Sequence, residues 1–401
     1  MRLPVYLDNH ATTPLDPRVL EAMMPFFTEH FGNAASKAHE YGWMAEAAVD
    51  VARGQVARLI GADSSEIIFT SGATESVNLA LKGVVEGHRR RNGRQAMHIV
   101  TAATEHHAVL DTCKALGMSG AGYTVLRVDQ FGRVDPDAVS QAIQDDTILV
   151  SVMWANNEIG TIAPMLEISE VCRAKGVLLH SDATQAAGKI PVDIRSIPVD
   201  LLSFSGHKMY GPKGIGALYI RGSSPRILLA PQMDGGGHER GLRSGTLNVP
   251  AIVGFGNAAK LAAAEMEEES KRVAELRDLL ERLICTALPD VLMNGHPVDR
   301  LANSASITFP GRRADAMILG MKDVAVSTGS ACSSAMPEPS HVLQAIGRLS
   351  AHARATLRFG LGRFTTKEEV LYAARRVVEV AAGSQPAAEA FHAFQNQGEH
   401  R

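Results

Sequence analysis

The feature that most constrains the fold of this chain is a regular alternation of short apolar segments with helical segments in its first 220 residues. The apolar segments have the length of strands and are rich in Ile, Val and Leu. Such alternation is typical of an α/β sheet whose strands run mostly parallel. Only about ten residues separate the last two segments, too few for a helical crossover, so that pair is expected to be antiparallel. The expected strands cover residues 66–70, 97–102, 123–128, 147–154, 176–181, 199–205 and 215–220.

The pattern changes after residue 250, where a long amphipathic helix is expected over 258–289. Shorter apolar segments and a closing amphipathic helix follow it. A chain of 401 residues is long enough for two domains. We expect a large domain over residues 17–261, and a smaller α+β domain made of residues 1–16 and 262–401.

Charge and composition exclude several classes of function. The formal net charge of −3 gives no reason to expect nucleic acid or an anionic membrane as a partner. No uninterrupted apolar stretch reaches the roughly 18 residues that a membrane span needs. Asp8 lies where a signal peptide would need its apolar region, so we expect a cytoplasmic protein. Its ligand is expected to be small.

The four cysteines fall into two groups. Cys113, Cys172 and Cys285 lie in helical patterns and are expected to be core residues; no CxxC pair suggests a zinc ribbon. Cys332 lies instead in a run of Gly, Ser and Ala, over about 327–339. Small residues cannot anchor a loop by packing, so we expect a mobile, accessible thiol there. The alternative is an incidental cysteine.

Polar residues follow most of the expected strands, where ligands of open α/β sheets bind. Taken singly, these groups have ordinary explanations: SGATES (71–76) is a helix cap, His106 is a half-buried histidine, and Asp182 is another cap. Taken together, they are expected to line one crevice. The groups are SGATES (71–76), TEHH (104–107), ANNE (155–158), DATQ (182–185) and GHK (206–208).

One ligand needs a phosphate cradle, a buried carboxylate and a lysine, and that ligand is pyridoxal phosphate. Its aldehyde bonds to a lysine, its ring nitrogen stays protonated opposite an aspartate, and its phosphate needs donors. Lys208 and Asp182 are expected at neighbouring strand ends. Lys213 is the competing lysine, but it lies further into the turn and is expected to be solvated. The second feature, Cys332, then suggests sulfur transfer from an amino acid.

Nearly the whole chain resembles the cysteine desulfurases of the NifS/IscS type, within the class V aminotransferases. The SGHK and TGSAC segments, in this order, are the most specific part of the resemblance. The matching segments are YLDNHATTPLDPRV (6–19), FGNAASKAHEYG (31–42), TSGATES (70–76), ATEHHAVLD (103–111), VSVMWANNEIGT (150–161), HSDATQAAGKIPVD (180–193), SFSGHKMYGPKGIGALY (203–219), GGGHERGLRSGTLNVP (235–250), STGSACSSAMPEPSHVL (327–343) and TLRFGLGRFT (356–365).

The resemblance implies a fold-type I, aspartate aminotransferase-like fold, with a mainly parallel seven-stranded sheet in the large domain. It implies that Lys208 holds the cofactor aldehyde and that Cys332 is the nucleophile. It also implies a homodimer, because one phosphate contact comes from the neighbouring subunit. By the same resemblance, Asp182 pairs with the ring nitrogen, Gln185 hydrogen-bonds the ring hydroxyl, and His106 stacks on the ring and moves protons. Asn157, which also contacts the cofactor, and Arg358 hold the substrate carboxylate. The residues implied to contact the phosphate are Ala73, Thr74, Ser205, His207 and the partner's Thr246.

By resemblance, the reaction converts L-cysteine to L-alanine and leaves a persulfide on Cys332. An iron–sulfur scaffold or another sulfur-acceptor protein then takes the sulfur. No metal site is implied, apart from transient iron–sulfur ligation by Cys332. The chain departs from the family pattern at Ala34-Ala35, Ser333 and Gly360, and its tail lacks the ending that docks an iron–sulfur scaffold.

Several alternatives stay open from the sequence. A selenocysteine lyase, or a lyase acting on another β-substituted amino acid, would use the same cofactor. A non-catalytic iron–sulfur assembly partner would keep the fold without the chemistry. Arg354 and Arg363 are nearby alternatives to Arg358, and both are expected to be solvated.

Overall fold

The computed structural model describes residues 1–93, 96–223, 227–328 and 339–383. Cys332, and most of the segment 327–339 in which a mobile loop is expected, lie outside the described residues. Among the residues that are described, no helix has the length and apolar character needed to cross a bilayer.

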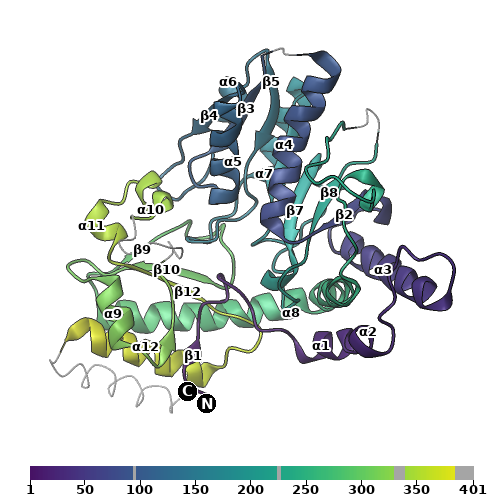
Figure 1. The fold of residues 1–401 in the computed structure, drawn as a ribbon. Helices are drawn as coiled ribbons and strands as arrows, with labels where there is room; N and C mark the ends of the chain where they lie inside the picture. The colour runs from purple at the N-terminus through teal and green to yellow at the C-terminus, as the bar shows by residue number, and fades with distance from the viewer. Residues whose placement is uncertain (94–95, 224–226, 329–338, 384–401) are drawn as a thin grey trace.

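A seven-stranded sheet forms the centre of the large part of the molecule (Figure 1), in the order β2-β8-β7-β6-β5-β3-β4. Every neighbouring pair is parallel except those that involve β8, which runs against both β2 and β7. The expected strands and the single antiparallel strand are therefore confirmed. The strands are β2 (Ile67–Thr70), β3 (His98–Ala102), β4 (Gly122–Leu126), β5 (Thr147–Ser151), β6 (Leu178–Asp182), β7 (Leu201–Ser205) and β8 (Gly216–Ile220).

Helices cover both faces of this sheet because its strands bury apolar residues on both sides. Ile68, Leu149 and Leu201 pack with α4 (Ala73–Asn92) and α5 (His107–Met118). Their chain neighbours pack on the opposite face, as the two-residue period of a strand requires. The helices on that face are α3 (Glu40–Leu59), α6 (Pro136–Ala142), α7 (Met165–Lys175) and the first half of α8 (Val249–Ala287).

A second cluster of buried residues lies around a three-stranded antiparallel sheet. Strand β10 (Ser304–Thr308) is its centre, between β12 (Thr356–Gly360) and β9 (Leu292–Met293). The chain's N-terminus joins this part, because β1 (Val5–Tyr6) pairs in parallel with β11 (Val324–Ala325). Its helices are α9 (Ala314–Gly320), α12 (Lys367–Ala382) and the second half of α8.

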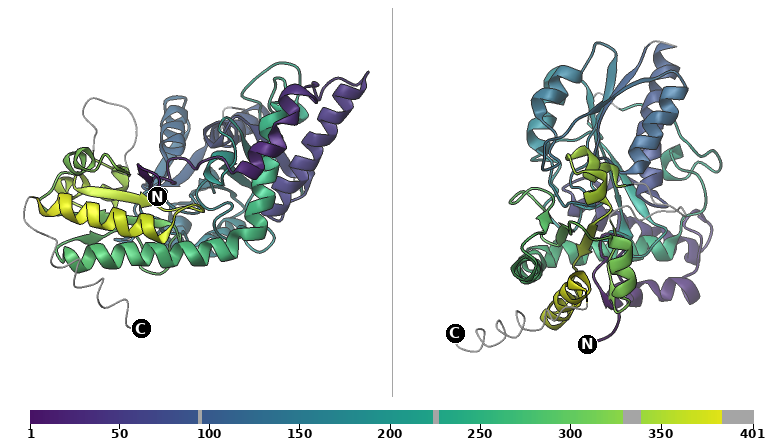
Figure 2. Two further views of the ribbon diagram at one scale, coloured as in Figure 1. Left: turned by 90° about the horizontal axis from the view of Figure 1, so that it is seen from below. Right: turned by 90° about the vertical axis from the view of Figure 1, so that its left-hand side faces the viewer.

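Helix α8 runs along both hydrophobic clusters without a break, as Figure 2 shows from below. Its first half packs in the cluster of the large sheet and its second half in the cluster of the small sheet. The expected apolar positions Val273, Leu276, Leu280, Leu283 and Ile284 are all buried. The predicted boundary between residues 261 and 262 falls inside this helix, and the division into two domains stays a prediction.

The three expected core cysteines of the described residues differ in burial. Two of the expected core cysteines, Cys113 on α5 and Cys172 on α7, are buried, and burial raises the pKa of each thiol to about 12. Cys285 on α8 is half-buried.

The remaining helices are short. They are α1 (Pro17–Met23), α2 (Pro25–Thr28), α10 (His341–Ala345) and α11 (Ser350–Ala353), with 3-10 turns η1 (Ser64–Glu66), η2 (Gly206–Lys208) and η3 (Glu239–Gly241).

A buried carboxylate anchors the long connection between β8 and α8. Glu239 adopts a left-handed backbone conformation, with φ of 48°, and its side chain is almost fully buried. Its two oxygens accept from Arg53 at 2.6 and 2.7 Å, and one also accepts from the backbone N–H of Phe69 at 2.7 Å. The connection is thereby fixed to β2, next to the start of α4.

Replacing Glu239 with alanine leaves the Arg53 guanidinium and the Phe69 N–H without their partner. We expect Glu239→Ala to lower the free energy of unfolding by about 3–5 kcal/mol. Denaturant unfolding measures this change. As a control, Arg90→Ala removes the exposed Arg90–Glu86 pair and should cost about 0.5 kcal/mol or less. Equal losses for both variants would contradict the anchoring role.

Candidate active site

The predicted site residues gather where the central strands of the large sheet end. Asp182 is the last residue of β6, and Ser205 is the last residue of the neighbouring parallel strand β7. Lys208 follows at the end of the turn η2. Since parallel strands end at one edge of a sheet, Asp182 and Lys208 lie on the same edge.

The start of α4 reaches the same place through a close backbone approach. Gly216 pairs with Ser205 on one side and lies against Gly72 on the other, so a Cβ on Gly216 would be 2.7 Å from the Gly72 Cα. No side chain of the described residues caps the first turn of α4, in which Ala73 and Thr74 lie. The free N–H groups of this turn and the positive end of the helix dipole suit an anion.

Lys208 is half-buried, and two backbone carbonyls hold its amine. Its Nζ donates to the carbonyl oxygens of His10 and Ala11, the latter at 2.7 Å. Burial, reinforced by the charge of Arg358, lowers the pKa of Lys208 to about 8, although Asp8 and Asp182 act in the opposite direction. A large fraction of this amine is therefore neutral near pH 8 and able to attack a carbonyl. The competing Lys213 is exposed, as expected.

The N-terminal segment Asp8–Thr13 contacts four of the predicted site residues, and sequence reasoning assigned it no role. Besides the two carbonyls on Lys208, Thr12 Oγ1 lies 3.1 Å from His207 Nδ1. The carbonyl of His10 also accepts from Gln185 Nε2 at 2.9 Å. The only signal in the sequence is the density of polar residues in DNHATT directly after an apolar pair.

His106 caps the N-terminus of α5, where its Nδ1 accepts from the backbone N–H of Ala108 at 3.1 Å. The neutral ring therefore carries its proton on Nε2. The residue is exposed to solvent. Surrounding protein atoms nevertheless lower its pKa, and the charges of Asp182 and Lys208 also act on it. His106 thus lies beside the other predicted site residues.

Arg358 reaches the site from β12 of the small sheet and is only 3% exposed. Its Nη1 donates to the backbone carbonyl of Asn157 at 2.9 Å, and its Nη2 lies 2.9 Å from Asp8 Oδ1. Its buried Nε has no hydrogen-bond partner within the described residues. An unused N–H on a buried guanidinium is suited to a carboxylate ligand.

The expectation that Arg363 is solvated is wrong. Its side chain is 9% exposed and forms ion pairs with Asp16 at 2.8 Å and Glu269 at 2.7 Å. Its guanidinium also stacks on the ring of Tyr210, 4.3 Å from the centroid. These partners come from distant segments of the chain, which the local sequence cannot reveal. Arg354 is exposed, as expected.

Thr246 is the predicted phosphate residue that the fold does not bring to the others. It is exposed in the connection between β8 and α8. In the described part of the chain its side chain makes no hydrogen bond to Ser205, His207 or the first turn of α4. Ser205, by contrast, is buried, and His207 and Asn157 are half-buried.

The arrangement of these groups fits pyridoxal phosphate. The N-terminus of α4 offers donors to a phosphate, and a Cβ on Gly72 would point into open space. The Ser205 hydroxyl lies at the same sheet edge, where it donates to the Ile215 carbonyl at 3.3 Å. Asp182 offers a buried carboxylate and Lys208 an amine with a lowered pKa. These are the groups that the cofactor's phosphate, ring nitrogen and aldehyde require.

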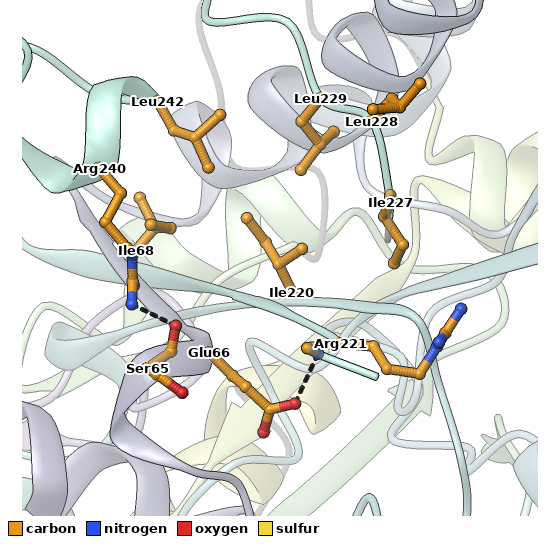
Figure 3. A pocket seen from close by; sticks show the side chains of 11 residues that line it. Ser65, Glu66, Ile68, Ile220, Arg221, Ile227, Leu228, Leu229, Arg240 and Leu242 are labelled. Atoms are coloured by element: carbon orange, nitrogen blue, oxygen red, sulfur yellow. Dashed lines mark hydrogen bonds between the residues drawn. The ribbon is translucent and has the colours of Figure 1, made fainter. Parts of the chain in front are cut away.

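A separate cavity of about 400 Å³ contains none of these residues (Figure 3). It lies at the edge of the large sheet, and its polar groups are already engaged: Glu66 accepts from the Gly222 N–H, and Arg240 donates to the Ser65 carbonyl. The candidate site is therefore distinct from this cavity. The cavity is lined by Ser65, Glu66, Ile68, Ile220, Arg221, Gly222, Ile227, Leu228, Leu229, Arg240 and Leu242.

The lowered pKa of Lys208 predicts its chemical reactivity in cofactor-free protein. Modification by an amine-directed reagent, followed by peptide mass spectrometry, should rise through a midpoint near pH 8, whereas an ordinary lysine has its midpoint near 10.4. Arg358→Met should raise this midpoint, because Arg358 disfavours the ammonium. Asp8→Asn should lower it, because Asp8 favours the ammonium. Shifts with the opposite signs would contradict this electrostatic description.

Comparison with known proteins agrees with this geometry. The sequence profile described as aminotransferase class-V matches residues 5–372. A protein named cysteine desulfurase IscS, from Anaeromyxobacter sp. (strain Fw109-5), is 53% identical over 379 residues, which cover 94% of this chain and 93% of the relative. Another of the same name, from Rickettsia bellii (strain OSU 85-389), is 50% identical over 94% of this chain and 90% of the relative.

Solved structures give the same result. One described as a NifS-like protein superposes with a TM-score of 0.87 at 38% identity, covering 95% of this chain and all of the other. Another, described as SspA in complex with cysteine, superposes with a TM-score of 0.78 at 35% identity, over 90% of this chain and 99% of the other. The chain therefore belongs to the class-V aminotransferase family and, within it, to the cysteine desulfurases.

Proposed function

We propose that this chain removes sulfur from L-cysteine with pyridoxal phosphate held on Lys208, and that Cys332 receives the sulfur. The observation that carries the proposal is the position of Lys208: its amine lies at the strand edge, with a pKa lowered by burial and by Arg358, within electrostatic reach of Asp182. When bound, pyridoxal phosphate draws electrons from the substrate α-carbon. The protein supplies the groups that bind, orient and exchange protons.

Each of these groups has a distinct task. The carboxylate of Asp182 holds the proton of the ring nitrogen, and Gln185 donates to the ring hydroxyl. The first turn of α4, at Ala73 and Thr74, binds the phosphate together with Ser205 and His207. Lys208 takes the proton from the α-carbon at its Nζ, and His106 stacks on the ring and carries protons at Nε2.

Arg358 and Asn157 hold the substrate carboxylate. Asp8 and the Asn157 carbonyl each take one N–H of an Nη atom and so fix the plane of the guanidinium. The second hydrogens of the two Nη atoms remain as a pair of donors. A carboxylate bound at this fork places the α-carbon of the substrate between Arg358 and Lys208. The amide side chain of Asn157 adds a donor from the loop that follows β5. Charge-assisted hydrogen bonds of this kind are stronger than neutral ones.

The assignment of Cys332 rests on the residues on either side of its segment. Before it, Ser327 is paired with Arg358 through the Arg358 N–H, which donates to the Ser327 carbonyl at 2.7 Å. After it, Ser340 Oγ lies 2.5 Å from Glu158 Oε2, and His341 Nε2 lies 2.9 Å from the carbonyl oxygen of Glu105, next to His106. The residues on both sides of the segment thus lie at the candidate site.

The transfer of sulfur from L-cysteine to Cys332 needs no further oxidant. The Cys332 thiolate attacks the sulfur of the substrate, the Cβ–S bond breaks, and its electron pair stays with the three-carbon product. Protonation of that carbon gives L-alanine, and Cys332 is left as a persulfide. A nucleophilic thiolate of this kind needs an accessible position near the reacting sulfur.

The partners and the location also belong to the proposal. The protein acts as a homodimer in which the partner subunit's Thr246 completes the phosphate site, which fits the exposure of Thr246 in one chain. The acceptor of the persulfide sulfur is an iron–sulfur scaffold or another protein, in the cytoplasm. A structural neighbour described as a complex with cysteine supports L-cysteine as the substrate. A selenocysteine lyase would instead release selenide faster than sulfide.

Cys332→Ala tests the nucleophile. Removal of the acceptor thiol should lower alanine formation from L-cysteine by more than about 100-fold, because the three cysteines of the described residues are buried or half-buried in helices. Mass spectrometry of the wild-type peptide that contains Cys332 should show one added sulfur atom, and the variant should keep the yellow colour of the bound cofactor. Cys285→Ala is the control and should retain activity. Sulfide release by Cys332→Ala at the wild-type rate would sink the assignment.

Arg358→Lys tests the carboxylate fork. Lysine keeps the positive charge but loses the planar pair of donors. We expect KM for L-cysteine to rise about 10- to 100-fold, the cost of charge-assisted hydrogen bonds, with a smaller change in kcat. Arg354→Lys, at an exposed position, is the matched control and should leave both parameters unchanged. An unaltered KM in Arg358→Lys would assign carboxylate binding to another residue.

A further inference from the structure

The amide of Gln185 is almost fully occupied by its neighbours. Its Oε1 lies 2.6 Å from Lys189 Nζ and 3.1 Å from His10 Nδ1. Its Nε2 donates to the backbone carbonyl of His10 at 2.9 Å. Gln185 is 3% exposed, so these contacts decide which way its amide faces.

The donor types fix that orientation. The ammonium form of Lys189, which predominates below its pKa of about 7, can only donate, so the atom it contacts is then the amide oxygen. The carbonyl of His10 can only accept, so the atom it contacts must be the amide nitrogen. Two independent partners therefore require the same orientation. Because Oε1 is an acceptor, the neutral ring of His10 carries its hydrogen on Nδ1.

Counting hydrogen bonds then leaves one unused donor. Both lone pairs of Oε1 are taken, by Lys189 and by His10, and one hydrogen of Nε2 is taken by the His10 carbonyl. The second hydrogen of Nε2 remains for a ligand. A group bound there must accept a hydrogen bond.

Lys189 and His10 are both buried among positively charged side chains. Lys189 belongs to a cluster of positive groups, because the charges of Lys208 and Arg358 act on it and only Glu269 opposes them. His10 is buried in the same cluster, with the charges of Lys189, Arg358 and Lys208 around it. Neither residue has a part in the function proposed above.

We propose that Lys189 is a positioning residue: with His10 it fixes the Gln185 amide so that the remaining Nε2 hydrogen donates to the ring oxygen of pyridoxal phosphate. The inference rests on the proposed role of Gln185. It explains why a second lysine lies beside Lys208 without holding the cofactor. An amide that faced the other way would present a lone pair to the ring oxygen and repel its anionic form.

The test compares pyridoxal phosphate with an analogue that lacks the ring hydroxyl. Both dissociation constants are measured by equilibrium dialysis with the full chain at about pH 6, where Lys189, with its pKa of about 7, is mostly an ammonium. Wild type should favour the natural cofactor, and Lys189→Met should reduce this preference about 3- to 10-fold, the effect of one misdirected hydrogen bond. Lys189→Arg, which can only donate, should restore it. Lys213→Met, at an exposed lysine, should not change it.

A second variant covers the case in which Lys189→Met does not fold. Lys189→Gln keeps a polar side chain but can donate or accept, so it no longer dictates the amide orientation and should also reduce the preference. In a Gln185→Ala background, Lys189→Met should have no further effect, because it acts through Gln185. An unchanged preference in Lys189→Met and Lys189→Gln would overturn the inference. An unchanged preference in Gln185→Ala alone would instead overturn the proposed role of Gln185.

Discussion

The contact between the N-terminal segment Asp8–Thr13 and the edge of the large sheet is the interaction on which the site depends. The segment leaves β1, which is paired with β11 beside the small sheet, and then crosses to Lys208, Gln185 and His207. On the way Asp8 pairs with Arg358 of β12. A single segment, which turns at residues 9–11, thereby contacts both the lysine and the arginine. Two of its backbone carbonyls accept hydrogen bonds from the Lys208 ammonium, in place of the water molecules that the ammonium loses on burial.

Much of the fold could be predicted from sequence because its signals are local. Each strand of the large sheet has its own apolar run, and the short connection before β8 is sufficient to make that strand antiparallel. The second half of α8 follows from the spacing of Val273, Leu276 and Leu280. The continuity of α8 across both cores was not apparent, because its first half is apolar on nearly all sides and shows little helical periodicity.

The site could be predicted only in part, for a physical reason. Asp182 and Lys208 each follow a strand, and strand order puts them together. The role of the N-terminal segment and the burial of Arg363 depend on contacts between residues hundreds of positions apart, such as Asp8 with Arg358 and Asp16 with Arg363. No local pattern marks such pairs. The sequence likewise placed Lys189 in a matching motif without any hint that it contacts Gln185.

Buried cationic groups are common to these contacts. Lys208 and Lys189 have pKa values lowered to about 8 and about 7, burial being the main cause in each, and the charge of Arg358 acts on both. Three carboxylates oppose these three cations: Asp8 and Asp182 act on Lys208, and Glu269 acts on Lys189. The main cost of the cluster is therefore the desolvation of its amines, which works against the folded state. A ligand that brings a phosphate, a ring oxygen anion and a carboxylate adds negative charge beside these amines and favours their ammonium forms, and by mass action it stabilises the fold that binds it. The cluster therefore favours anionic ligands, and this is the chemistry that a cofactor phosphate and an amino-acid carboxylate share.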